Sequence, residues 1–82
     1  MAPADHRVTL LTKPGCHLCD DARAVVARVC GELGVPWSEV DITGSPQLWA
    51  EHHERIPVTF VDDEEHDYWR VSEDRLRAEL LG

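Results

Sequence analysis

Two cysteines separated by two residues stand between an apolar run and a long helical pattern, and this arrangement constrains the chain most. Cys16 and Cys19 follow the apolar stretch 8–11, and the helical pattern begins at about Asp20. At a strand-to-helix junction, the helix N-terminus offers unpaired N–H groups and the positive end of its dipole to the first sulfur. The pattern therefore favours a thiolate there and predicts thiol–disulfide exchange.

Hydrophobic spacing and chain breakers divide the rest of the chain into strands and helices. We expect strands at 7–12, 36–42, 56–61 and 66–71, helices at 20–33 and 46–53, and a last helix capped by Ser72. The order β-α-β-α-β-β-α contains one right-handed β-α-β crossover. It predicts an α/β fold in which a four-stranded mixed sheet carries three helices on its two faces.

The same patterns give expectations for individual side chains. Cys30 lies on the apolar face of the first helix, which predicts a buried core thiol. Adjacent residues on a strand point to opposite faces, so one of Tyr68 and Trp69 should face outward. Further expectations are a core position for Leu76, Leu80 and Leu81, burial of Leu48, Trp49 or both, and solvent exposure of His52 and His53.

Length and charge limit the possible classes of function. The 82 residues suit one domain, which we place at 7–82 after a disordered tail at 1–6. Sixteen acidic residues against eight Lys and Arg give a net charge of −8, so the positive surface that nucleic acids require is lacking. The first residues do not resemble a secretory signal, and no stretch is apolar enough to span a membrane. We expect a cytoplasmic protein that binds neither nucleic acid nor membrane.

Other uses of the cysteine pair remain open at this point. The C-x-x-C spacing also serves zinc, for which His17, Cys30, His52 or His53 could supply further ligands. However, no second C-x-x-C or H-x-x-x-H pair exists, and adjacent helical side chains such as His52 and His53 diverge. A purely structural role for the two thiols is a further alternative. The strand-turn-helix context favours redox chemistry over both, and we expect no metal.

Two motifs in this order of elements resemble the glutaredoxins and small glutaredoxin-like proteins of the thioredoxin superfamily. They are Lys13-Pro-Gly-Cys-x-x-Cys19 and Arg55-Ile-Pro-Val58, and the likeness extends from Arg7 to Leu81. It implies a thioredoxin-like fold with a cis peptide at Pro57 beside the cysteines. It also implies that Cys16 attacks a substrate disulfide and Cys19 resolves the mixed disulfide.

The resemblance suggests a substrate site as well as a redox pair. We expect Lys13, His17, Ile56, Pro57 and Arg70 to bind substrate, which would be a disulfide of a protein or of a small thiol. No cofactor is expected. Glutathione, another low-molecular-weight thiol or a flavoprotein would be the reductant, and we expect a monomer.

The chain departs from the family pattern on both sides of this site. His17-Leu18 stands between the cysteines where many glutaredoxins have Pro-Tyr. The Gly-Gly turn whose N–H groups help bind a glutathione carboxylate is replaced by acidic residues and the segment 66–70. Lys13 matches the family's glutathione-contacting lysine, and Arg70 could supply a second cation.

Two hypotheses follow from the sequence. The first is a dithiol–disulfide oxidoreductase that takes part in electron transport and cell redox homeostasis. The second is a non-catalytic thioredoxin-fold module that uses the Pro57 groove to bind a partner peptide or a metal. The first requires both Cys16 and Cys19 for turnover, whereas partner binding under the second survives loss of Cys16.

Overall fold

Four strands and three α-helices alternate along the chain, with a short 3₁₀ turn before the second helix. The computed structural model describes residues 5–82. Its elements are β1 (Val8–Thr12), α1 (His17–Leu33), β2 (Trp37–Asp41), η2 (Ile42–Gly44), α2 (Pro46–His52), β3 (Val58–Val61), β4 (Glu64–Tyr68) and α3 (Glu73–Leu81). The predicted β-α-β-α-β-β-α order is confirmed, and β2 and β3 are shorter than expected.

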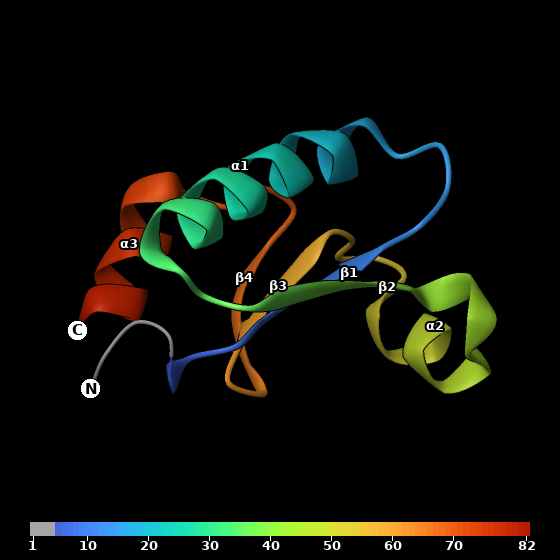
Figure 1. Ribbon diagram of the computed structural model, residues 1–82. Helices are drawn as coiled ribbons and strands as arrows, with labels where there is room; N and C mark the ends of the chain where they lie inside the picture. The colour runs from blue at the N-terminus through green and yellow to red at the C-terminus, as the bar shows by residue number, and fades with distance from the viewer. Residues whose placement is uncertain (1–4) are drawn as a thin grey trace.

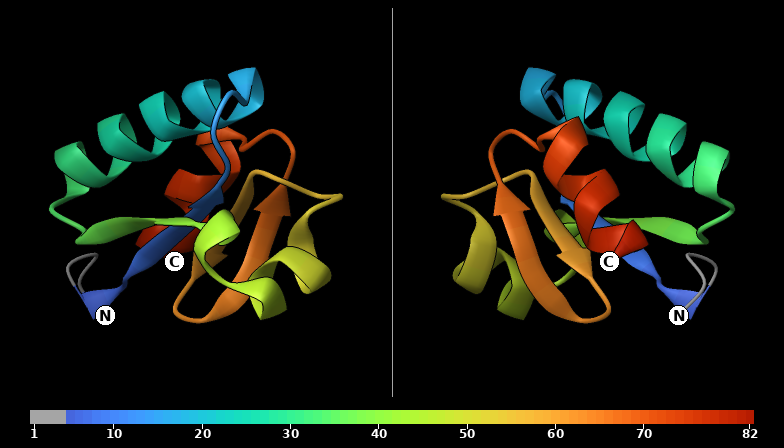
Figure 2. Two further views of the ribbon diagram at one scale, coloured as in Figure 1. Left: turned by 90° about the vertical axis from the view of Figure 1, so that its right-hand side faces the viewer. Right: turned by 90° about the vertical axis from the view of Figure 1, so that its left-hand side faces the viewer.

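The sheet is mixed, and β1 and β3 form its centre. Its strand order is β2-β1-β3-β4, in which β1 is parallel to β2 and antiparallel to β3, and β3 and β4 form an antiparallel hairpin. In Figure 1, α1 and α3 lie over one face of the sheet and α2 lies beside the other. Figure 2 shows the same layers from both sides. The predicted four-stranded mixed sheet with helices on both faces is therefore confirmed.

Two apolar clusters hold these layers together. The larger one packs Val8 and Leu10 of β1 against α1 and α3. The smaller one lies at the end of β1 that leads to the cysteines, and its buried members are Leu11, Cys19, Ile42, Ile56 and Val58. Because apolar burial stabilises the fold roughly in proportion to area, the second cluster stabilises the cysteine region itself.

Helix α1 begins earlier than its apolar periodicity indicates. We predicted a start at about Asp20, but the helix begins at His17 because Cys16 acts as its N-cap and its sulfur accepts a hydrogen bond from the Cys19 N–H. Gly34 ends the helix in the left-handed conformation (φ 71°), which glycine adopts without a steric penalty. Cys30 is 1% exposed, so the expected buried thiol is confirmed.

The predicted last hairpin is present, but the predicted bounds of its turn and second strand were wrong. We expected a turn at 62–65 and a strand at 66–71, whereas β4 pairs from Glu64 onward after a turn made by Asp62 and Asp63 alone. Both aspartates have positive φ angles, 53° and 73°, which suit a two-residue hairpin turn. The acidic residues suggested a loop. However, β4 is an edge strand, and the exposed positions of an edge strand need not be apolar.

Helices α2 and α3 have the predicted caps but differ in what they bury. Ser45 and Ser72 are the N-caps, as expected, and each side-chain oxygen accepts a backbone N–H. Leu76 and Leu80 are fully buried, but the prediction for Leu81 was wrong, since it is 57% exposed at the end of α3.

In helix α2, one expectation about side-chain burial is confirmed and another was wrong. Leu48 packs against the smaller cluster, whereas Trp49 is 42% exposed. The predicted exposure of His52 was wrong, because its ring packs edge-on against Phe60. The end of α2 is thus attached to β3.

The N-terminal boundary is described only in part. Residues 1–4 of the predicted tail lie outside the described residues, and His6 at its end contacts Asp62. The single-domain boundary at 7–82 stays a prediction. Within residues 5–82, none of the helices is both long and apolar enough to cross a membrane.

Candidate active site

Cys16 and Cys19 lie at the start of α1 in the geometry of a helix cap. Cys16 has an extended backbone (φ −102°, ψ 111°) and is half-buried, and its Sγ accepts a hydrogen bond from the Cys19 N–H at 3.2 Å. Cys19 is 1% exposed. Both thiols are free. Cys16 is therefore partly accessible from solvent, whereas Cys19 is not.

The environment of Cys19 keeps its thiol protonated. Burial, followed by the hydrogen bond with Cys16, raises the pKa of Cys19 to about 11, and the Lys13 backbone and the Arg23 charge act against this rise. Since a thiolate is the nucleophile, Cys19 is inactive at neutral pH until its proton is removed. Cys19 is thus both less accessible than Cys16 and held in its protonated form.

The proline loop packs against the cysteine pair. The Ile56–Pro57 peptide is cis, as the resemblance implies. Ile56 is 6% exposed and shares the smaller apolar cluster with Cys19, and Cys16 packs against the same cluster. The Pro57 carbonyl accepts the Trp69 N–H at 2.8 Å, which ties this loop to the end of β4. The start of α1, the Ile56–Pro57 loop and the end of β4 are distant in the sequence but are thus linked to one another at this site.

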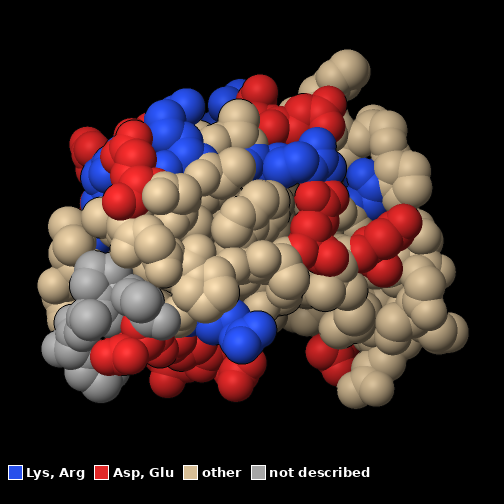
Figure 3. Space-filling view, viewed as in Figure 1, with Lys and Arg blue, Asp and Glu red and all other residues tan. Residues whose placement is uncertain are grey.

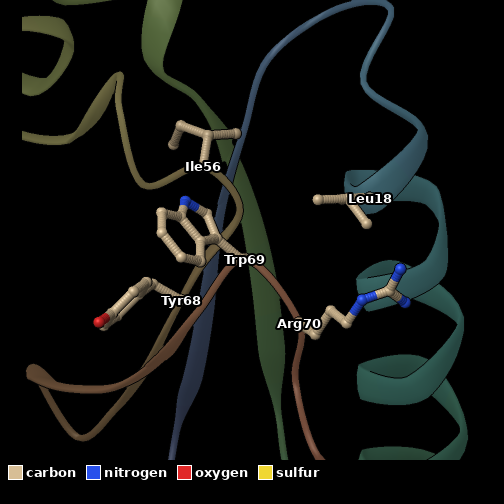
Figure 4. Close-up of a pocket in the computed structure, with 5 residues that line it drawn as sticks. All are labelled: Leu18, Ile56, Tyr68, Trp69 and Arg70. Atoms are coloured by element: carbon tan, nitrogen blue, oxygen red, sulfur yellow. The ribbon is translucent and has the colours of Figure 1, made fainter.

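A groove of about 450 Å³ is lined by Leu18, which lies between the two cysteines in the sequence, and by Ile56, which shares a cluster with Cys19 (Figure 4). Leu18, the residue between His17 and Cys19, points from α1 across the groove toward Ile56 and Trp69. The lining residues are Leu18, Ile56, Tyr68, Trp69 and Arg70. A mainly apolar groove with one guanidinium fits a substrate with both apolar and anionic groups.

Two of the predicted substrate residues line this groove and three do not. Ile56 and Arg70 line it, and Pro57 is fully buried. Lys13 is half-buried three residues before Cys16, and His17 is exposed at the first position of α1, so both lie near the sulfurs but outside the lining.

Three groove residues were not predicted from the sequence, or only in part: Leu18, Tyr68 and Trp69. Only one aromatic residue was expected to face outward, but Tyr68 and Trp69 are 45% and 52% exposed and both line the groove. The alternation fails because β4 ends at Tyr68 and Trp69 has a φ of 63°. For Leu18, its place between the two cysteines was the available signal.

A polar network joins the end of β1 to α1 near the site. Glu39 of β2 accepts two hydrogen bonds from the Arg23 guanidinium, at 2.6 and 2.7 Å, and one from the Thr12 hydroxyl at 2.8 Å. Thr12 is only 3% exposed. Arg23 holds the pKa of the Glu39 carboxyl below its usual value. This Glu39 network, made of Thr12, Arg23 and Glu39, links the strand before the cysteines to the helix after them.

Basic residues form no separate surface on the face in Figure 3, where Lys and Arg side chains lie among Asp and Glu side chains.

Among residues 5–82, no group of three or more His, Cys, Asp and Glu side chains is arranged to hold a metal ion. The zinc alternative therefore has no ligand set within the described part of the chain.

Comparison with known proteins identifies the family. A family model described as "Glutaredoxin-like domain (DUF836)" matches residues 7–81. The chain belongs to this glutaredoxin-like family. It is also 40% identical over 79 residues to "Uncharacterized protein Mb0520" of Mycobacterium bovis and to "Uncharacterized protein Rv0508" of Mycobacterium tuberculosis, covering 90% of this chain and 81% of each relative.

Solved structures resemble the chain in fold. Protein XcR50 from X. campestris is 32% identical with a TM-score of 0.71, over 89% of this chain and 93% of that one. Protein Ne2328 from Nitrosomonas europaea has a TM-score of 0.77 at 22% identity, over 90% and 89%. A mutant thioredoxin from Halobacterium salinarum has a TM-score of 0.69 at 17% identity, over 96% and 74%. The last two likenesses concern the fold alone, and the fold of this glutaredoxin-like chain is thioredoxin-like.

Proposed function

We propose that this glutaredoxin-like protein is a dithiol–disulfide oxidoreductase that reduces protein or low-molecular-weight disulfides through Cys16 and Cys19. One observation carries the proposal. A half-buried sulfur caps α1 and accepts the N–H of a second cysteine, while Ile56 packs in the same apolar cluster as both. Structural thiols require neither partial access nor an adjacent groove.

The proposed reaction has two exchange steps. The Cys16 thiolate attacks one sulfur of the substrate disulfide, so that a Cys16–substrate disulfide forms and the other substrate sulfur leaves as a thiolate. Cys19 then loses its proton to solvent and attacks Cys16 Sγ, which releases the second substrate thiolate and forms a Cys16–Cys19 disulfide. The substrate gains two electrons, and two protons from solvent complete its thiols. Two molecules of an external thiol, or one molecule of a dithiol or of a reduced flavoprotein, return the two electrons to the protein.

The electrostatics support this order of events. The hydrogen bond and negative charge of Cys16 are among the causes that raise the pKa of Cys19 to about 11, after burial. Once Cys16 is bound in a mixed disulfide, it carries no charge, and these two contributions disappear. The pKa of Cys19 then falls below about 11, although burial still raises it, so the resolving thiolate forms more readily after the first step.

Reductant, partners and location belong to the same proposal. Lys13 stands three residues before Cys16 and Arg70 lines the groove. These two cations support glutathione or another anionic small thiol as the reductant, with a flavoprotein reductase as the other candidate. We propose that the protein works in the cytoplasm as a monomer and needs no cofactor.

Single cysteine variants test the proposal. Cys16→Ser is expected to abolish reduction of a small disulfide such as 5,5′-dithiobis(2-nitrobenzoate), because no attacking thiolate remains. Cys19→Ser should accumulate a Cys16 mixed disulfide that intact-mass measurement detects. Cys30→Ala is the matched control, since Cys30 is buried elsewhere on α1 and should leave turnover unchanged. Equal turnover by the Cys16→Ser variant and the unmodified protein would reject the proposal.

A non-catalytic binding module is the second candidate, and the groove with two exposed aromatic rings supports it. Under this alternative, Cys16→Ser leaves partner binding largely intact and Cys19→Ser traps no mixed disulfide. The same two variants therefore separate the candidates.

A further inference from the structure

Two aromatic rings lie exposed along one side of the groove. Tyr68 and Trp69, here called the aromatic wall, are 45% and 52% exposed, and their rings meet edge-to-face at 5.1 Å between centroids. In Figure 4, Trp69 lies below Ile56 and faces the groove that Leu18 enters from α1. Rings of this size leave a large apolar area in contact with water, and a ligand that covers this area gains binding free energy.

The aromatic wall is held in place before any substrate arrives. The Trp69 N–H donates to the Pro57 carbonyl at 2.8 Å, and its indole Nε1–H donates to the Glu54 carbonyl at 3.0 Å. The Arg55 guanidinium lies 5.9 Å from the centre of the Tyr68 ring. The left-handed backbone of Trp69 is unusual for a bulky residue and is maintained by these contacts. Side chains fixed in this way lose little entropy when they bind a ligand.

Arg70 supplies the charge of the same groove. Five of the other Arg side chains form ion pairs within residues 5–82, namely Arg23, Arg28, Arg55, Arg75 and Arg77. Arg70 forms none among the described residues, although the chain has a net charge of −8 and Asp21 lines the adjacent hollow of about 200 Å³. An accessible guanidinium beside an apolar wall complements a carboxylate next to an apolar side chain.

Building on the proposed function, we propose that the aromatic wall and Arg70 select polypeptide disulfides with a large apolar or aromatic residue beside the reacting cysteine and a nearby Asp or Glu. The apolar residue packs on Tyr68 and Trp69, and the carboxylate pairs with Arg70. Glutathione has carboxylates but no large apolar side chain, so it leaves the aromatic wall uncovered. The groove therefore favours a protein substrate over a small thiol disulfide.

Four matched peptides test this selection without changing the protein. Each carries one cysteine joined to 2-nitro-5-thiobenzoate, with Phe or Ala on one side and Asp or Lys on the other. The released chromophore gives the second-order rate constant for attack by the reduced protein. We expect the Phe peptides to react roughly tenfold faster than the Ala peptides, as burial of an aromatic side chain implies. The Asp peptides should react several-fold faster than the Lys peptides at low salt.

Protein variants assign each preference to its side chain. Trp69→Asn removes the ring and tolerates a positive φ, so the Phe-to-Ala rate ratio should fall to below about twofold. Trp49→Ala, which removes an exposed ring on α2 outside the groove, should keep the ratio. Arg70→Glu should reverse the Asp-to-Lys preference, whereas Arg7→Glu, at an exposed position outside the groove, should not.

The outcomes separate this inference from the proposed function. If the unmodified protein reduces 5,5′-dithiobis(2-nitrobenzoate) through Cys16 but treats the four peptides alike within about twofold, the selection is refuted and the oxidoreductase stands. If it reacts with neither reagent class, the oxidoreductase itself fails. Because the peptide comparison uses the unmodified protein, an unfolded Trp69 variant does not prevent a decision.

Discussion

Removal of the Glu39 carboxylate should destabilise the fold mainly through one buried hydroxyl. The Thr12 side chain is 3% exposed, and its hydroxyl donates to Glu39 at 2.8 Å. In Glu39→Ala this donor remains buried without a partner. An unsatisfied buried hydroxyl costs about 1–3 kcal/mol, and the lost ion pair with the exposed Arg23 adds little. For a chain of this size, that cost lowers the melting temperature by roughly 4–8 °C per kcal/mol.

A double-mutant cycle in urea isolates this effect. Thr12→Val removes the hydroxyl that Glu39 satisfies, so Glu39→Ala in that background should cost less than in the unmodified protein by about 1–3 kcal/mol. Glu79→Ala, which removes an exposed carboxylate on α3, is the control and should change stability by less than about 0.5 kcal/mol. Equal costs of Glu39→Ala with and without Thr12 would refute the reasoning.

Two further predictions concern stability. Burial raises the pKa values of Cys19 and Cys30 to about 11. The contribution of these thiols to the stability of the reduced fold is therefore fully present below the pKa of an unfolded cysteine, about 8.5. It is lost as the pH rises toward about 11. The free energy of unfolding, measured in urea at a series of pH values across this range, should decline less steeply with pH for Cys30→Ala than for the unmodified protein. Parallel declines would contradict the contribution assigned to Cys30. At the β3–β4 turn, Asp63→Gly should stabilise the fold by about 1 kcal/mol because glycine adopts a φ of 73° without strain. A lower urea midpoint for this variant would refute that account of the turn.

Local chemistry made half of the site predictable from the sequence. The spacing of Cys16 and Cys19 and the breakers before them locate a helix N-terminus, and the Ile56–Pro57 motif locates the loop that packs beside it. Both features depend on residues close together in the chain, whose conformations are limited by their own backbone preferences. The apolar face of α1 was likewise readable because its period is regular.

The other half depends on contacts between distant segments. The aromatic wall exists because Trp69 takes a left-handed conformation and donates to Glu54 and Pro57, which alternation along a strand cannot indicate. Edge strand β4 also lacks the apolar alternation that marks a half-buried strand. The partnership of Glu39 with Thr12 and Arg23 follows from strand register, which the periodicity of single segments does not specify.

The central claim is reversible exchange between the Cys16–Cys19 dithiol and its disulfide, and a redox titration tests it most directly. The protein is equilibrated in thiol–disulfide buffers of graded potential, and its free thiols are counted by alkylation and intact mass. We predict one reversible two-electron transition with a midpoint between about −270 and −120 mV, present in Cys30→Ala and absent from Cys16→Ser and Cys19→Ser. Absence of an intramolecular disulfide at every buffer ratio, in protein shown to be folded, would contradict the account.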